Sequence, residues 1–395
     1  MRNELTSRFT SSCPMVKGAR PGQRLVAEVF RPNSLTTEAG PTLPGQPVTL
    51  LMAHASGFHK EVWYPIINDL SLTSAAWAEQ PYDAGVRAYR AFPNRLQKPK
   101  RGESATPGDE TSPTPGPAWY IHHIIVFDVC DHGDSAALNQ PTLPSKTTWF
   151  DNARDIIALV DQLSCRGALI GIGHSYGATS MLLAQIMWPT LFDALLMIEP
   201  AIPFAGRHYW EMRFDFILKR KRVWPDYTSA LAYFQKHPFY QSWDPRSLAI
   251  YIQYGLTPMT ADPLSSGGSA ESESSTKRNS GQDPGPIAVT FKCTPEVEHQ
   301  AFLAGAIDGV WLFNRLIDIV CPLRYIMGTD SNICPNDRFA QAHVSASYTA
   351  DLHFIAQSGH MVVMESPQTI ADQVSRFIGH GLAWQKGPPA LQPRL

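Results

Sequence analysis

The residues best suited to covalent chemistry form the pentapeptide Gly173-His174-Ser175-Tyr176-Gly177. It follows the apolar run Ala168 to Ile172 and precedes an apolar helical pattern that starts near Ala178. A strand, a sharp turn and a helix are the context of a G-x-S-x-G nucleophile elbow, in which the glycines permit the turn and the serine hydroxyl is exposed. The N–H groups that open the helix can stabilise a developing oxyanion. The sequence therefore predicts Ser175 as a nucleophile.

A serine nucleophile needs a base and a carboxylate that orients the base. His360 is the best-placed histidine, because it follows the last predicted strand and precedes a C-terminal helical pattern. Two carboxylates could orient it. Glu199 ends the apolar run Ala194 to Ile198, and Asp330 follows the run Leu323 to Met327. Both positions satisfy the requirement for a carboxylate near the imidazole Nδ1, so the residues themselves leave the choice open.

An oxyanion hole needs two backbone N–H groups. We expect one from Tyr176, directly after the nucleophile, and one from the loop that follows the apolar run Val48 to Ala53. That loop reads His54-Ala-Ser-Gly-Phe-His59, and Ser56 is the predicted donor.

Two further polar segments have competing interpretations. Asp128 to Ser135 holds carboxylates and a histidine, but the spacing gives no closed ligand set, so a hydrogen-bonded turn is favoured over a metal site.

Lys219-Arg-Lys-Arg222 resembles a nuclear-localisation signal, yet its aromatic flanks favour a solvated helix face. Its charge could also attract an anionic substrate such as a nucleotide-bearing thioester.

The elements that must position these residues alternate along the chain. Short apolar runs of the kind found in strands buried on both faces alternate with helical patterns. The runs begin at Val48, Ile121, Ala168, Ala194, Leu323 and Leu352, and the helical patterns cover Trp149 to Leu163, Ala178 to Met187 and Gln368 to Ile378. This alternation predicts an α/β fold with a mostly parallel, doubly wound sheet. The uncharged stretch Gly167 to Phe192 is long enough to span a membrane, but its polar residues and glycines favour a strand, turn and helix.

Composition narrows the classes of protein. The chain has 395 residues and a net charge of −2, which gives no electrostatic case for a nucleic-acid or acidic-membrane partner. Six scattered cysteines fit buried thiols better than disulfides or a zinc site. The N-terminus has no apolar segment typical of a secretory signal.

The 33 prolines exceed the usual ~5% and concentrate outside the expected core. We expect the core over 1–203 and 301–385, interrupted by a disordered Pro-rich insert at about 80–118. Residues 204–300 are rich in aromatics and are predicted to form a helical lid insertion, with a disordered Ser/Gly-rich tract at 262–286.

The tail, 386–395, ends in Pro393-Arg394-Leu395. This end resembles the Ser-Lys-Leu peroxisomal address, so we expect an import receptor as partner and a peroxisomal location, with the cytoplasm as the alternative.

Taken together, these motifs resemble the α/β-hydrolase superfamily. The loop at His54 looks like its oxyanion loop, with alanine for the usual glycine, and Asp128 to Ser135 looks like its D-x-R-G-H-G-x-S turn, with Cys130 for arginine. More narrowly, the chain is similar to fungal peroxisomal hydrolases of secondary metabolism, which include the acyl-CoA hydrolase of mycophenolic acid biosynthesis and hydrolases of host-selective toxin clusters. In that group the acid lies about 24 residues past the nucleophile, the spacing from Ser175 to Glu199, although the group has aspartate there.

The resemblance implies a serine hydrolase with Ser175, Glu199 and His360 as its triad and no cofactor. An acyl-CoA-type thioester of a bulky apolar metabolite is the expected substrate, in secondary metabolite or toxin biosynthesis. The first alternative is an oxygen-ester hydrolase with the same machinery. The second, from another class of protein, is a non-catalytic hydrolase-fold protein that binds a metabolite.

Overall fold

The computed structural model describes residues 1–35, 45–75, 86–90, 118–143, 146–202, 214–259, 287–331, 347 and 350–384. Most of the expected insert at about 80–118, the expected tract at 262–286 and the tail at 386–395 lie outside these residues.

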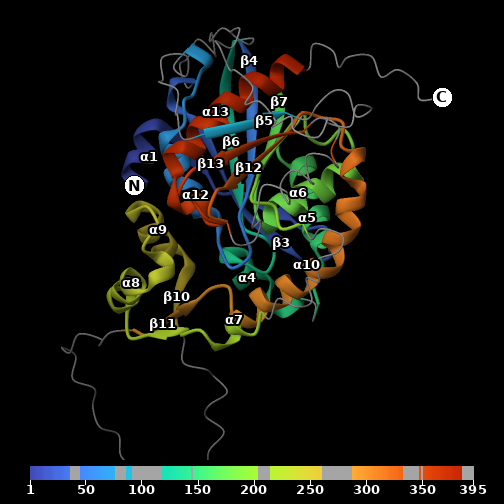
Figure 1. The fold of residues 1–395 in the computed structure, drawn as a ribbon. Helices are drawn as coiled ribbons and strands as arrows, with labels where there is room; N and C mark the ends of the chain where they lie inside the picture. The colour runs from blue at the N-terminus through green and yellow to red at the C-terminus, as the bar shows by residue number, and fades with distance from the viewer. Residues whose placement is uncertain are drawn as a thin grey trace, which may run out of the picture.

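A large, mostly parallel sheet forms the centre of the molecule (Figure 1). Its described strands are β1 (Phe9–Ser12), β2 (Met15–Lys17), β3 (Arg24–Pro32), β4 (Gln46–Ala53), β5 (Val86–Arg90), β6 (Trp119–Phe127), β7 (Ala168–His174), β8 (Ala194–Ile198), β12 (Leu323–Gly328) and β13 (Ala350–Ile355). The order is β1-β3-β6-β4-β7-β8-β12-β13-β5, with β2 paired to β3. From β6 to β13 every neighbouring pair is parallel. The predicted fold class is confirmed.

Helices cover both faces of this sheet, because its central strands are apolar on both sides. In β4, Leu50 and Met52 pack on one face, whereas Leu51 and Ala53 pack on the other. The first face is covered by α1 (Arg2–Arg8), α2 (Tyr64–Asp69), α12 (Val362–Glu365) and α13 (Pro367–Trp384). The second is covered by α5 (Trp149–Gln162), α6 (Tyr176–Met187) and α10 (Pro295–Arg315), and α4 (Gly133–Asn139) packs on β3. Figure 1 shows the two helical layers on either side of the strands.

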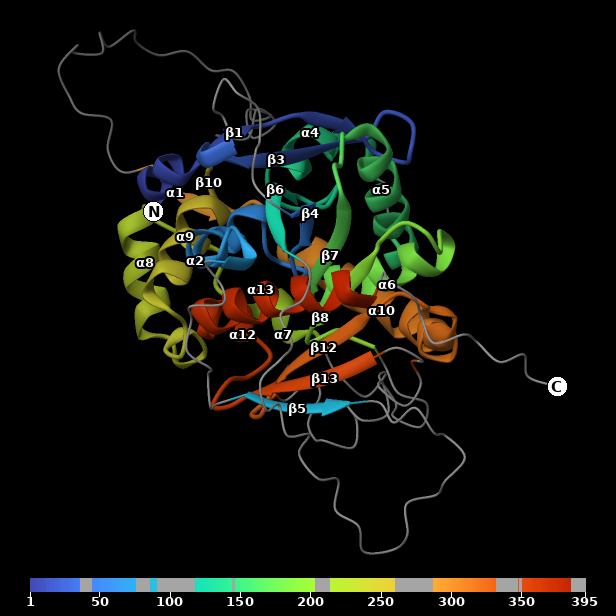
Figure 2. The ribbon, with the colours of Figure 1, turned by 90° about the horizontal axis from the view of Figure 1, so that it is seen from above.

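The two edges of the sheet contain antiparallel strands that the sequence analysis did not predict. Strands β1, β2 and β3 extend one edge with antiparallel pairs. The short apolar run Leu25-Val-Ala-Glu-Val-Phe30, which only Glu28 interrupts, is the signal that could have predicted β3. At the other edge, Val86–Arg90 forms β5 and pairs antiparallel with β13, although it falls inside the insert expected to be disordered (Figure 2).

The segment of residues 214–259 and 287–298, which lies between β8 and the first turn of α10, packs against the carboxyl ends of the strands. Its described elements are α7 (Phe216–Lys219), β9 (Val223–Trp224), α8 (Tyr227–Lys236), α9 (Pro245–Gly255), β10 (Leu256–Pro258) and β11 (Val289–Phe291). Beside the expected helices it contains a small antiparallel sheet in the order β10-β11-β9. The rings of Trp243 and Tyr251 lie 5.9 and 5.2 Å from that of Phe58, which follows β4. We call this segment, residues 214–259 and 287–298, the lid.

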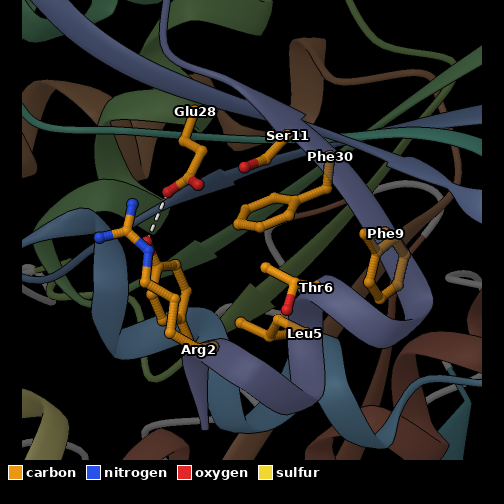
Figure 3. A pocket seen from close by; sticks show the side chains of 8 residues that line it. Arg2, Leu5, Thr6, Phe9, Ser11, Glu28 and Phe30 are labelled. Carbon is orange, nitrogen blue, oxygen red and sulfur yellow. Dashed lines mark hydrogen bonds between the residues drawn. The ribbon is translucent and has the colours of Figure 1, made fainter.

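A small cavity lies under α1, among Arg2, Leu5, Phe9, Glu28, Phe30 and Tyr64 (Figure 3). The Tyr64 hydroxyl donates a hydrogen bond to the buried Glu28 carboxylate there. None of the predicted site residues lines this cavity, which belongs to the packing of the N-terminal arm. Short 3₁₀ turns complete the described structure: η1 (Asn33–Leu35), η2 (Lys60–Trp63), η3 (Gln140–Thr142), η5 (Pro238–Tyr240) and η6 (Leu316–Asp318).

Candidate active site

Ser175 occupies the turn between β7 and α6. Its φ is 52° and its ψ is −114°, a backbone conformation that L residues other than glycine rarely adopt. The Ser175 N–H donates to the Ile198 carbonyl oxygen at 2.9 Å, which fixes the turn to the end of β8. Helix α6 begins at Tyr176, so its N-terminus lies directly beside the serine. The local structure is thus the sharp strand-to-helix turn that the sequence predicted.

The second glycine of the elbow brings this turn against the neighbouring loop. A Cβ atom on Gly177 would lie 2.4 Å from the Ala53 carbonyl oxygen and 2.6 Å from that of His54. Only a residue without a side chain allows this approach. The N-terminus of α6 therefore packs directly on the end of β4 and the start of the predicted oxyanion loop.

His360 connects Ser175 to Glu199. Its Nε2 lies 3.0 Å from the Ser175 Oγ, and its Nδ1 lies 3.0 Å from the Glu199 Oε2. Because an ionised carboxylate only accepts, Nδ1 carries the proton and Nε2 is left to accept from the serine hydroxyl. The His360 carbonyl oxygen also accepts from the His174 Nε2 at 2.9 Å, which holds the loop of His360 on the elbow.

Glu199 is fully buried and held at both carboxylate oxygens. Oε1 accepts from the Gly328 N–H at 2.7 Å, and Oε2 accepts from the Ser331 hydroxyl at 2.6 Å. Its φ of 47° turns the backbone sharply after β8. Asp330 is instead exposed, and its carboxylate accepts from the Thr329 hydroxyl at 3.0 Å. Of the two carboxylates that the residues left open, the structure brings Glu199 to His360.

The loop after β4 is held by His54. The Val129 N–H donates to the His54 Nε2 at 3.2 Å, so the proton of this buried ring is on Nδ1, which donates to the Ala55 carbonyl oxygen at 2.7 Å. Burial is the main cause that lowers the pKa of His54 well below its usual value, and a charge on His132 adds to it. The imidazole is therefore neutral at ordinary pH, as this pattern of one donor and one acceptor requires.

The orientation of the Ala55 carbonyl determines that of the Ser56 N–H. A second donor, the Phe58 N–H, also binds the Ala55 oxygen, at 3.2 Å. In a trans peptide the carbonyl and the following N–H point in opposite directions, so these two bonds aim the Ser56 N–H away from His54. Among the described residues, neither the Ser56 nor the Tyr176 N–H has a protein acceptor. Both are available to a bound oxygen.

The turn after β6 is organised by Lys60. Its buried ammonium group lies 3.0 Å from the Asp128 carboxylate, 2.7 Å from that of Asp134 and 2.7 Å from that of Glu61. Although burial alone lowers the pKa of Lys60, these carboxylates raise it above its usual value. Within the described part of the chain, no cluster of three or more histidine, cysteine or acidic side chains is placed to hold a metal ion. The Lys60 ammonium occupies the position among these carboxylates that a metal ion would need.

The basic tetrapeptide Lys219 to Arg222 begins at the last residue of α7 and contacts other residues of the lid. The Arg220 guanidinium pairs with Glu298 and lies 4.4 Å from the centre of the Phe291 ring. Lys221 lies over aromatic rings of the lid, and Arg222 pairs with Glu296 at 2.8 Å. The segment is therefore neither a regular helix face nor a free cluster of charge.

Sequence reasoning did not identify Gly328 and Ser331, which bind the Glu199 carboxylate, or the positioning contacts of His54 and His174. In the segment Gly328-Thr-Asp-Ser331 the sequence pointed only to Asp330, although a polar loop after a core strand is itself a signal. Cys13, Cys130, Cys165 and Cys293 are free thiols. In the ranges that the structure describes, no helix is both long and apolar enough to cross a bilayer.

Comparison with known proteins gives the class. A model of the alpha/beta hydrolase family matches residues 50–373, which is most of the 395-residue chain. The chain belongs to the alpha/beta hydrolase family, and the resemblance inferred from its motifs is confirmed.

Particular relatives are fungal. A type I acyl-CoA thioesterase of Penicillium roqueforti is 27% identical over 146 residues, covering 34% of this chain and 33% of the relative. The peroxisomal membrane protein LPX1 of Saccharomyces cerevisiae is 24% identical over 284 residues, covering 65% and 66%. The abhydrolase domain-containing protein AFT2-1 of Alternaria alternata is 19% identical, covering 53% and 82%. The chain thus spans about a third to two thirds of the length of the first two relatives.

Solved structures share the fold. The peroxisomal alpha-beta-hydrolase Lpx1 of Saccharomyces cerevisiae superposes with a TM-score of 0.68 at 17% identity, covering 98% of this chain and 93% of that one. A thioesterase domain from the curacin biosynthetic pathway has a TM-score of 0.55 at 12% identity, covering 92% and 99%. At these identities the likeness is one of fold.

Proposed function

We propose that this protein is a serine hydrolase that cleaves an acyl thioester, with Ser175 as nucleophile, His360 as general base and Glu199 as the carboxylate that orients the base. The observation that carries the proposal is the hydrogen-bonded chain Ser175–His360–Glu199, whose two links are both 3.0 Å long. Such a chain lets the imidazole accept the hydroxyl proton while the carboxylate stabilises the resulting imidazolium.

In the first half-reaction the Ser175 Oγ attacks the acyl carbon and its proton moves to the His360 Nε2. The substrate carbonyl oxygen becomes an oxyanion, which the Ser56 and Tyr176 N–H groups stabilise. When the tetrahedral intermediate collapses, the carbon–sulfur bond breaks and the leaving thiolate receives the proton from His360. The products of this step are an acyl-Ser175 ester and a free thiol.

In the second half-reaction water attacks the acyl-enzyme. His360 Nε2 accepts a proton from the water as the oxygen bonds to the acyl carbon, and the same oxyanion site stabilises the second intermediate. Collapse then breaks the bond to the Ser175 Oγ, which regains a proton from His360, and the carboxylic acid leaves. His360 thus accepts and returns the proton in both half-reactions.

The thioester is favoured over an oxygen ester by the relatives named as acyl-CoA thioesterases in Penicillium. The aromatic side chains of the lid that face Phe58 favour a bulky apolar acyl group. An oxygen-ester hydrolase is the second candidate, since an esterase of Mycobacterium tuberculosis shares the fold with a TM-score of 0.53. The third is a non-catalytic binder of a metabolite. A role in secondary metabolite or toxin biosynthesis is part of the first proposal, and the genes beside this one would test it.

Labelling with a fluorophosphonate separates an enzyme from a binder. We expect the wild type to be labelled at Ser175 and the Ser175→Ala variant to remain unlabelled. Equal labelling of both proteins, or none of the wild type, would exclude the enzyme. Thiol release from a panel of acyl-CoAs, compared with the hydrolysis of matched p-nitrophenyl esters, then decides between thioester and oxygen ester.

We further propose import into the peroxisomal matrix through Pro393-Arg394-Leu395, supported by a relative whose name places it in the peroxisome. A fluorescent protein fused to the N-terminus should colocalise with a peroxisomal marker in a fungal cell. Deleting Leu395 should move the signal to the cytoplasm, and a cytoplasmic signal from the full chain would favour the alternative location.

A further inference from the structure

A buried carboxylate–imidazole pair lies behind the oxyanion loop, in the turn after β6. The His132 Nδ1 is 2.6 Å from the Asp131 Oδ1, and the two residues are 0% and 4% exposed. The Thr147 hydroxyl donates to the other Asp131 oxygen at 3.4 Å. Because Nδ1 faces a carboxylate it carries a proton, and the orientation of the ring is fixed from this side.

The opposite edge of the His132 ring faces the predicted oxyanion site. Its Nε2 lies 3.5 Å from the Ser56 Oγ, at the long end of the hydrogen-bond range. The ring centre is 6.1 Å from that of Tyr176 and 5.4 Å from that of His54. A single imidazole therefore contacts the side chains of both residues whose N–H groups would bind the oxyanion.

The charges around His132 come from several elements. Asp131 lies on its own turn, His54 on the loop after β4, and Cys293 and Glu298 on the lid side. Burial opposes a charge on His132, but Cys293 and Asp131 outweigh it and raise the pKa of the imidazole well above its usual value. With Nδ1 bound to Asp131, Nε2 and the Ser56 hydroxyl can join in one hydrogen bond in either direction, since a hydroxyl both donates and accepts.

We propose that His132, oriented by Asp131, is a positioning residue of the oxyanion hole: it holds the Ser56 side chain and so fixes the backbone N–H of the same residue. The inference rests on the proposed serine hydrolase function. The bond to Ser56 shortens when the oxyanion forms, as catalytic hydrogen bonds that are long in an empty site commonly do. His132 thus acts on the transition state more than on the bound substrate.

The test is a double-mutant cycle with His132→Phe and Ser56→Ala, assayed on p-nitrophenyl butyrate and butyryl-CoA. Phenylalanine keeps a ring of similar shape without the ring nitrogens, and alanine keeps the Ser56 N–H without the hydroxyl. We expect each single variant to lose about 10-fold in kcat with KM changed less than about twofold, because loss of an entire oxyanion donor costs about 10²–10³-fold. The double variant should lose no more than the larger single loss, since both changes remove the same contact.

Two further variants separate positioning from mere packing. His132→Gln restores a donor and should recover part of the lost kcat, whereas Asp131→Asn should lose kcat in the same way as His132→Phe. Binding of a trifluoromethyl ketone, which forms a tetrahedral oxyanion on Ser175, should weaken by the same factor as kcat, while inhibition by butyrate stays unchanged. His123→Phe, which changes a histidine of β6 outside the site, is the matched control and should leave kcat unchanged.

Additive losses in the cycle, or a kcat of Asp131→Asn and His132→Phe within twofold of the wild type, would overturn the inference. If His132→Phe does not fold, the Asp131→Asn and Ser56→Ala variants carry the same test. If fluorophosphonate labels the wild type at Ser175 but the substitutions leave kcat unchanged, only this inference is removed. A wild type that is not labelled removes the proposed function, and the inference with it.

Discussion

The Nδ1 of His360 and the Oε2 of Glu199 lie 3.0 Å apart, although the two residues are separated by 161 positions in the chain. Glu199 follows β8, His360 follows β13, and β12 lies between these strands. The Gly328 N–H at the end of β12 binds the second Glu199 oxygen. The contact thus depends on three strands whose carboxyl ends lie at one edge of the sheet.

Glu199→Gln should abolish most of the activity. An amide of the same length would present a donor or an uncharged acceptor to Nδ1, so the imidazole tautomer and the imidazolium are no longer supported. We expect kcat to fall by about 10³–10⁴-fold with the fold intact. Steady-state rates on an acyl-CoA substrate, with circular dichroism to verify folding, measure the effect. Asp330→Asn is the control and should stay within a few-fold of the wild type; the reverse result would transfer the role to Asp330.

Lys60→Met should destabilise the protein strongly. The methionine fills the space, but it leaves the buried Asp128 and Glu61 carboxylates without their cation. Breaking a buried ion pair from one side costs about 3–5 kcal/mol of unfolding free energy. Urea denaturation provides the measurement. Arg222→Met, which removes an exposed pair with Glu296, should cost less than about 1 kcal/mol, and equal costs for the two variants would contradict the assigned role of the buried network.

His174 should make the fold sensitive to mild acid. Burial, with the charge of His360 adding to it, lowers the pKa of His174 to about 3, whereas the unfolded chain binds this proton near pH 6.5. The stability contributed by the neutral ring is complete above pH 6.5 and falls by about 1.4 kcal/mol per pH unit below it, until pH is near 3. Between pH 7 and pH 5 the wild type should therefore lose about 2 kcal/mol more than His174→Gln. Urea denaturation at both pH values tests this, and identical losses for the two proteins would exclude the mechanism.

Gly177→Ala should separate the elbow from the oxyanion loop. The new methyl group would lie 2.4 Å from the Ala53 carbonyl oxygen, so α6 must move. A displacement of this kind costs about 10²-fold in kcat. Gly379→Ala in α13 is the matched control, because its Cβ would meet nothing closer than the Trp119 Nε1 at 3.6 Å. That variant should keep its kcat and gain up to about 1 kcal/mol from helix propensity. Thermal unfolding and initial rates distinguish the two.

The sequence predicted the parts of the fold that have strong local signals. The central strands are continuous apolar runs and the elbow has fixed glycines, so β4, β6, β7, β8 and β12 were located to within a few residues. Strands β1, β2, β3 and β5 were missed. The strands β1 and β2 are short and partly exposed, and β5 pairs with β13, which lies far along the chain. The choice between Glu199 and Asp330 depended on a resemblance, because the local sequence does not show which carboxylate turns towards His360. The chemical roles of these residues stay a prediction.

Two members of the Ser175–His360–Glu199 chain have a left-handed backbone, with φ values of 52° and 47°. Glycine adopts this conformation without steric cost, whereas serine and glutamate adopt it at the expense of folding stability. Heat resistance and turnover therefore favour different residues at these two positions. A library of variants screened only for resistance to thermal unfolding should enrich glycine at 175 and 199. Its most thermostable members should have no hydrolase activity.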